Sequence, residues 1–170
     1  MLMKELCWFF DVDGVMTDGQ VSYPSLERSF SVRDGHGISL IDYDTNIYVA
    51  IISGENDASI RVRAAKLNVS VHHAKDKYDF IKQYYPKLPY VAISDDIMDI
   101  PLLQNAIIAF CPNDAEPEVI NVIKNHPYGH VLSRKGGNHC VREAVDYLLS
   151  NKYLQDKFGI KVVQQTERHL

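Results

Sequence analysis

Residues 8–19 read WFFDVDGVMTDG, and this stretch decides the fold. An apolar run leads directly into Asp11 and Asp13, which stand two residues apart before a glycine. A short apolar run that is closed by Asp and Gly is typical of a buried strand, so residues 6–10 are predicted to form one. Ligands of open α/β sheets bind beyond the carboxyl ends of the strands. The sequence therefore predicts a polar site directly after its first strand.

The rest of the chain alternates between strand and helix patterns. Further buried strands are predicted from short runs rich in Ile, Val and Ala, at residues 47–53, 90–94 and 107–111, and SVHH at residues 70–73 is a weaker strand candidate. Helices are predicted at residues 37–44, 55–67, 75–85, 99–106, 115–126 and 139–154. A hairpin of two short strands is predicted within residues 20–32. This alternation predicts an α/β fold with a Rossmann-like, doubly wound parallel sheet that helices cover on both faces.

Composition limits the class of protein. The 170 residues predict a single domain over 1–170, large enough to bury a core. The net charge of −4 is too small to predict nucleic acid or an anionic membrane as a partner. No apolar stretch approaches the roughly 20 residues of a membrane span, and no signal peptide is found. Three widely spaced cysteines suit a reducing compartment, so we expect a cytoplasmic protein.

Polar, reactive residues follow four of the predicted strands. The four segments are DVDG at residues 11–14, SGEND at 53–57, KDK at 75–77 and SDDIMD at 94–99. Each segment alone has an ordinary structural explanation as a turn, a helix cap or a solvated lysine. Together they favour one shared site, because the carboxyl ends of parallel strands meet at one edge of the sheet.

The carboxylates at this edge predict metal-assisted chemistry on a phosphate. Like charges so close cannot all stay ionised without a cation, and carboxylate oxygens suit Mg²⁺, which usually binds together with a substrate phosphate. The predicted Mg²⁺ ligands are Asp11, Asp13, Asp95 and Asp96. Asp11 is then placed to attack phosphorus, while Asp13 acts as acid and base. Ser53 and Lys77 are predicted to hold the remaining phosphate oxygens.

These four motifs resemble those of the haloacid dehalogenase superfamily of phosphohydrolases. In this resemblance Asp11 is the nucleophile and Asp13 the acid/base, while Ser53 and Lys77 represent the second and third motifs. The fourth motif usually begins with Gly, where this chain has Ser94. Other stretches resemble the family of 3-deoxy-D-manno-octulosonate (KDO) 8-phosphate phosphatases and sialic-acid-type 9-phosphate phosphatases, namely FSVRDGHGI, IISGE, RAAKL, DDIMDIPLL and KGGNHCVREAVDYLL.

The family resemblance implies a compact enzyme without a separate cap domain. It also implies a homotetramer in which hairpins and tails of neighbouring subunits close each active site. The short segment between Gly19 and residue 47 leaves no room for a large cap, and residues 19–33 are expected to form a hairpin flap with apolar side chains buried against neighbours. The implied substrate contacts are Asp13, Thr17, Arg33, Asp34, His36, Glu55, Arg63, Lys66 and Lys77.

Two positions bear on the sugar acid. Relatives that act on nine-carbon acids resemble this chain in having Glu55 and Lys66, whereas eight-carbon relatives usually have Arg and a small residue there. The first expectation is therefore a phosphatase of KDN or N-acetylneuraminate 9-phosphate, with KDO 8-phosphate as the alternative. Eleven helical residues would separate the two side chains by about 16 Å, so both reach one substrate only if a neighbouring subunit supplies one.

Two other classes remain open. One is a non-catalytic assembly module associated with an acylneuraminate cytidylyltransferase, and the retained aspartates argue against it. The other is a phosphotransferase or mutase, and the missing cap argues against that.

Overall fold

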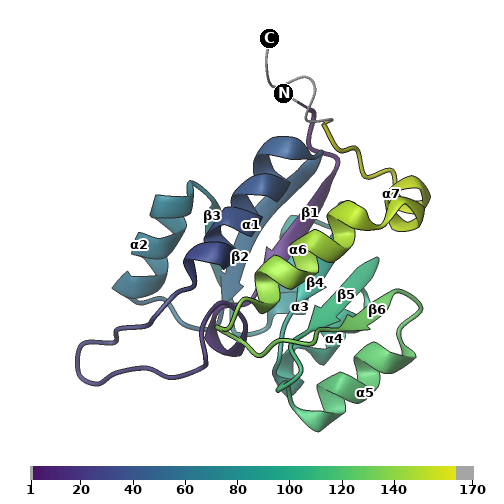
Figure 1. The fold of residues 1–170 in the computed structure, drawn as a ribbon. Helices are drawn as coiled ribbons and strands as arrows, with labels where there is room; N and C mark the ends of the chain where they lie inside the picture. The colour runs from purple at the N-terminus through teal and green to yellow at the C-terminus, as the bar shows by residue number, and fades with distance from the viewer. Residues whose placement is uncertain (1, 164–170) are drawn as a thin grey trace.

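The structure is a computed structural model that describes residues 2–163. Strand β1 (Leu6–Phe10) lies in the middle of its six-stranded sheet. The strand order is β3-β2-β1-β4-β5-β6, and every neighbouring pair is parallel (Figure 1). The other strands are β2 (Ile47–Ser53), β3 (Ser70–His73), β4 (Tyr90–Ile93), β5 (Ile108–Cys111) and β6 (Gly129–Val131). This confirms the predicted Rossmann-like α/β fold; the predicted domain over 1–170 extends beyond the described residues at both ends.

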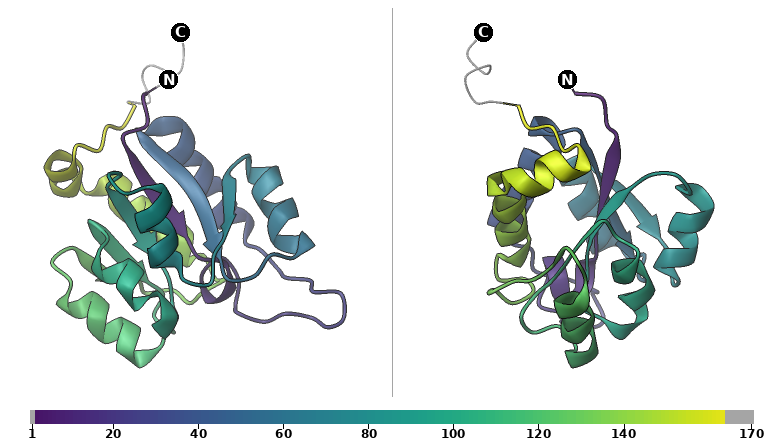
Figure 2. Two further views of the ribbon diagram at one scale, coloured as in Figure 1. Left: turned by 180° about the vertical axis from the view of Figure 1, so that it is seen from behind. Right: turned by 90° about the vertical axis from the view of Figure 1, so that its right-hand side faces the viewer.

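Helices cover both faces of the sheet (Figure 2). One face carries α1 (Val32–Asp44), α2 (Ala58–Leu67), α6 (Cys140–Ser150) and α7 (Lys152–Phe158). The other face carries α3 (Lys77–Tyr84), α4 (Ile100–Gln104) and α5 (Pro117–Asn125). Both faces of β1 are therefore buried, which explains why its sequence is apolar throughout rather than alternating.

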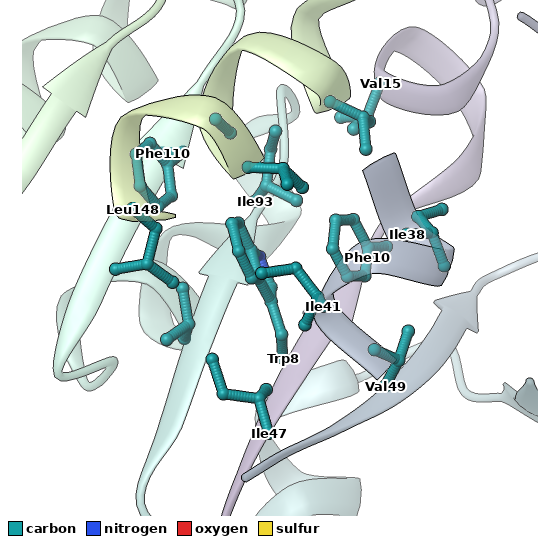
Figure 3. Close-up of a cluster of buried hydrophobic side chains, with 14 of the residues drawn as sticks. Trp8, Phe10, Val15, Ile38, Ile41, Ile47, Val49, Ile93, Phe110 and Leu148 are labelled. Atoms are coloured by element: carbon teal, nitrogen blue, oxygen red, sulfur yellow. The ribbon is translucent and has the colours of Figure 1, made fainter. Parts of the chain in front are cut away.

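The core on the α1 and α6 side is built around aromatic rings from β1 and β5, which lie on either side of β4 in the sheet (Figure 3). Trp8 stacks on Phe10 and on Phe110, with ring centroids 4.9 and 5.4 Å apart. Cys7 and Phe9 alternate with them and pack into the core on the opposite face. The rigid centre of the sheet thus ends directly at Asp11.

The flap differs from its prediction. Residues 19–31 contain no regular strand, and the only antiparallel pairing there is one bridge between Ser22 and Glu27. The last residues of the predicted flap belong to α1, because Ser31 caps that helix by accepting a hydrogen bond from the Asp34 backbone N–H (3.2 Å). The flap, defined from here on as residues 19–31, projects from the body of the domain (Figure 1), and Tyr23 on it is 83% exposed.

The two ends of the described chain meet at the amino edge of the sheet. Glu5 and Lys161 form an ion pair of 2.7 Å, and Val162 pairs with Thr45 in an antiparallel bridge. The strands run from this edge toward the opposite one, where the candidate site lies. No helix within residues 2–163 is long and apolar enough to cross a membrane.

Candidate active site

A cavity of about 530 Å³ lies at the carboxyl edge of the sheet. The four predicted segments all contribute to its wall, because each follows a strand of the same parallel sheet. The lining residues are Asp11, Asp13, Gly14, Gly19, Ser53, Gly54, Glu55, Lys75, Lys77, Asp95, Asp96, Met98 and Asp99. The structure thus brings together every residue that the sequence predicted for catalysis and for the metal.

Lys77 is clamped between two carboxylates at the floor of the cavity. Its Nζ lies 2.7 Å from Asp11 Oδ1 and 2.5 Å from Asp99 Oδ2, and all three side chains are less than a tenth exposed. Burial acts to lower the pKa of Lys77, but the charges of Asp11 and Asp99 outweigh this and leave the pKa raised. The site therefore contains a permanent cation where a phosphate anion is expected.

Asp11 is fixed by several donors. Its Oδ1 accepts hydrogen bonds from Lys77 and from the backbone N–H of Val12 (2.8 Å), which begins the helical turn η1 (Val12–Met16). The Ser94 hydroxyl donates to Oδ2 at 3.2 Å and also contacts Asp99. Burial raises the pKa of Asp11 against the opposing charge of Lys77. Ser94, which replaces the glycine usual in the fourth motif, thus supplies a hydrogen bond to the predicted nucleophile.

Asp95 packs against Gly14 so closely that no side chain fits there. A Cβ atom on Gly14 would lie 1.8 Å from Asp95 Oδ2, and the φ of +81° at Gly14 independently favours glycine. Asp95 Oδ1 is buried without a hydrogen-bond partner among the described residues. Burial, followed by the nearby charge of Asp11, raises the pKa of Asp95 to about 8.

This pair of carboxylates fits a bound divalent cation. An unsatisfied buried carboxylate oxygen beside a second carboxylate is stabilised by a positive charge, and oxygen donors of this kind suit Mg²⁺. Within residues 2–163, however, no three side chains of His, Cys, Asp or Glu form a ready-made metal cluster. The carboxylates of Asp11 and Asp95 therefore form a partial metal-binding site rather than a complete coordination shell.

The glycine-rich segment KGGN at residues 135–138, called the tail motif from here on, supports the catalytic loop of its own chain. Gly137 donates its backbone N–H to Val15 O at 2.9 Å, and a Cβ on Gly136 would lie 1.9 Å from Gly14 O. The loop that carries Asp11 and Asp13 is thus wedged between Asp95 and the tail motif.

Asp13 stands between this cavity and a second one. Its carboxylate accepts hydrogen bonds from Thr17 Oγ1 (3.2 Å) and from Arg28 of the flap. The second cavity, of about 610 Å³, is lined by the flap and by the segment before α2. The two cavities share Asp13, Gly54, Glu55 and Lys75. A phosphate held at Lys77 thus has room beside it for the organic part of a substrate.

Several predicted substrate contacts lie outside the cavities. Asp34 is buried and accepts a hydrogen bond from the Arg142 backbone N–H (2.8 Å), while Arg63 donates to Ser31 O (2.8 Å). Thr17 is buried behind Asp13. Arg33, His36 and Lys66 are exposed and line neither cavity. Their role in substrate binding stays a prediction that requires a second subunit.

Sequence reasoning missed four residues of the site. Arg28 contacts Asp13, and Ser94 contacts Asp11. Asp99 pairs with Lys77, and Lys75 lines both cavities. The motif KDK was a usable signal for Lys75, because both of its lysines follow a strand end. Nothing in the spacing pointed to Arg28.

Comparisons with known proteins agree with this geometry. The KDO 8-phosphate phosphatase of Haemophilus influenzae is 36% identical over 149 residues, which cover 82% of this chain and 79% of that protein. The phosphatase of Moraxella catarrhalis, solved in complex with magnesium, phosphate and KDO, superposes with a TM-score of 0.77 at 26% identity and covers 91% of this chain and 92% of that one.

A haloacid dehalogenase superfamily hydrolase from Legionella pneumophila superposes with a TM-score of 0.75 at 28% identity, over 91% of this chain and 86% of that one. A search against models of protein families found no match. The identity and coverage of the Haemophilus enzyme nevertheless decide the family. The chain belongs to the 3-deoxy-D-manno-octulosonate 8-phosphate phosphatases of the haloacid dehalogenase superfamily, a family of phosphoric monoester hydrolases.

Proposed function

We propose that this protein is a Mg²⁺-dependent phosphatase of a 3-deoxy-2-ulosonic sugar-acid phosphate, with KDO 8-phosphate as its substrate. The observation that carries the proposal is the buried arrangement of Asp11, Lys77 and Asp95 in a cavity that continues into a second one. The relatives support the eight-carbon substrate over the nine-carbon acids that the sequence first suggested.

The reaction proceeds in two displacements on phosphorus. Asp11 attacks the phosphate and forms an aspartyl phosphate, the bond from phosphorus to the ester oxygen breaks, and Asp13 gives its proton to the leaving oxygen. Asp13 then takes a proton from water, whose oxygen attacks the phosphorus and releases inorganic phosphate and free Asp11. Ser53 and Lys77 bind the phosphate oxygens throughout.

Asp11 and Asp95 would hold Mg²⁺, and Asp96 on the wall of the same cavity could contribute to its binding. The carboxylate of Asp13, the fourth predicted ligand, is engaged by Arg28 instead. The ion supplies positive charge that lets a phosphate dianion approach clustered carboxylates.

We expect chelator to abolish turnover and Mg²⁺ to restore it. Because the pKa of Asp95 is raised to about 8, the metal must displace a proton from it below that pH, and the Mg²⁺ concentration for half-maximal activity should rise as the pH falls. Asp95→Asn should raise this concentration more than Asp99→Asn, because Asp99 already binds Lys77. Mg²⁺ titrations of activity between pH 6 and 9 measure both effects, and full activity in excess chelator would remove the metal from the mechanism.

Glu55 is the observation that favours the alternative substrate, a nine-carbon acid phosphate. It lines both cavities, and its identity resembles that of relatives that act on nine-carbon acids. We expect the wild type to have the higher kcat/KM on KDO 8-phosphate, compared side by side with N-acetylneuraminate 9-phosphate. Glu55→Arg should shift the preference further toward the shorter acid. Glu118→Arg, the same charge reversal on exposed α5, is the control.

A wild-type preference for the nine-carbon phosphate would overturn the choice of substrate and leave the reaction in place. We expect the molar mass of the same samples to correspond to the four chains that the family resemblance implies. Arg33, His36 and Lys66 line neither cavity, so they require a neighbouring subunit to reach a substrate. A monomer that discriminates between the two acids would remove these residues from the substrate site.

A further inference from the structure

Arg28 returns from the exposed flap into the active site. Its side chain is 1% exposed, although the flap itself projects into solvent (Figure 1). Its Nε lies 2.7 Å from Asp13 Oδ1 and its Nη2 lies 2.9 Å from Asp13 Oδ2, which is a two-pronged pairing of guanidinium and carboxylate. This pairing fixes both the position and the rotation of the carboxylate.

The other end of the guanidinium is anchored to α2. Arg28 Nη1 lies 2.5 Å from Asp57 Oδ2 and 3.0 Å from Ser59 Oγ. Asp57 is itself held as the cap of α2, where its Oδ1 accepts a hydrogen bond from the Ile60 backbone N–H. Hydrogen bonds to Asp13 and Asp57 raise the pKa of Arg28 further above its ordinary value. A continuous chain of charged contacts therefore runs from the scaffold to Asp13.

The contacts distinguish the two oxygens of Asp13. Oδ1 accepts from both Arg28 and Thr17, which uses both of its lone pairs. Oδ2 accepts only from Arg28 among residues 2–163, so one lone pair remains. Oδ2 is therefore the oxygen that can carry a proton to the leaving group.

We propose that Arg28 is a positioning residue for the phosphatase reaction. It orients Asp13 so that Oδ2 faces the leaving oxygen, and proton delivery therefore depends on the flap being packed against the active site. The inference rests on the proposed function, because it takes Asp13 as the acid. Two other roles of Arg28 give different results in one experiment. If Arg28 only held the flap in place, its removal would lower the activity on all substrates equally. If its contact with Asp13 opposed catalysis, its removal would raise the activity.

The experiment compares two classes of phosphate ester. The alkyl ester KDO 8-phosphate needs a proton on its leaving oxygen, whereas p-nitrophenyl phosphate releases a stabilised phenolate without one. The ratio kcat/KM reports the steps up to release of the alcohol or phenol, so it isolates the step in which Asp13 acts as acid. We expect Arg28→Ala to lower kcat/KM about 100-fold on the alkyl ester and at least tenfold less on the aryl ester.

Two further measurements keep the test decisive if Arg28→Ala folds poorly. Arg28→Lys keeps the charge but cannot form the two-pronged contact, so it should show the same selective loss to a smaller degree. Added guanidinium ion should restore part of the alkyl-ester activity of Arg28→Ala. Arg142→Ala, which removes a carboxylate-paired arginine from α6, should leave both esters unaffected.

Equal losses on both esters would overturn the positioning role, and so would a gain in activity. A wild type that hydrolyses neither ester would overturn the proposed function as well. These results are distinguishable, because the wild-type rates test the reaction and only the ratio between esters tests Arg28.

Discussion

Asp11→Asn is expected to lower kcat roughly 10⁴-fold or more while the protein stays folded, because an amide cannot form the aspartyl phosphate. The substitution keeps the size of the side chain, and Lys77 keeps its contact with Asp99. Release of phosphate and the unfolding transition are measured on the same sample. Loss of activity with an unchanged transition would assign Asp11 to chemistry rather than to folding.

Asp18→Asn is the matched control, since Asp18 lies on the same loop but is exposed. Among residues 2–163 its side chain accepts a hydrogen bond only from the Gln20 backbone N–H, within its own turn. It should keep activity close to that of the wild type. Substantial turnover by Asp11→Asn would rule out the covalent mechanism. An inactive wild type would instead favour the non-catalytic assembly module.

Lys77→Met should lower the free energy of unfolding by about 3–5 kcal/mol at neutral pH, in chelator, because it leaves Asp11 and Asp99 buried without their cation. Without Lys77 the already raised pKa of Asp11 rises further. A carboxyl whose folded pKa exceeds its unfolded pKa destabilises the protein increasingly as the pH rises between the two values. The loss should therefore be larger at pH 8 than at pH 5, as urea unfolding can measure.

Lys82→Met is the control for this substitution. Lys82 also pairs with an aspartate, Asp79, but both side chains are more than half exposed. Its removal should leave the free energy of unfolding close to that of the wild type at either pH, because solvent screens an exposed pair. Equal losses in the two variants would mean that the buried clamp contributes no more than an exposed pair.

The strands were predictable wherever burial on both faces forces an apolar sequence. Four of the six strands, β1, β2, β4 and β5, follow this rule, with β1 as the clearest case. Strand β3 (Ser70–His73) is partly exposed and gave only a weak signal. Strand β6 (Gly129–Val131) was not predicted, because it has only three residues, all partly exposed, and contains no apolar run. Its pairing with β5 depends on where α5 returns the chain, which local sequence does not specify.

Helix boundaries were less predictable than helices. α1 begins well before the predicted residue 37, because the Ser31 cap overcomes the unfavourable helix propensity of Gly35 and Gly37. The predicted helix over 139–154 is two helices, since the Asn151 side chain accepts a hydrogen bond from the Leu154 backbone N–H and starts α7. The apolar pattern continues across this break and conceals it.

The catalytic cluster was predictable because its members are attached to strand ends, whose positions the parallel sheet fixes. Asp11 and Lys77 needed no further information to be brought together. Arg28 was not predictable, because its contact with Asp13 depends on the path of an irregular flap that has neither periodicity nor regular pairing.

The meeting of Glu5 and Lys161 has a practical consequence. Both lie at the edge of the sheet opposite the cavity, so a solid support or a fusion partner attached beside either residue lies away from the flap and the entrance. An enzyme immobilised in this way presents its open side to the solution. The closeness of Glu5 and Lys161 also suits a permuted gene in which a short linker joins these two positions and new ends are opened elsewhere.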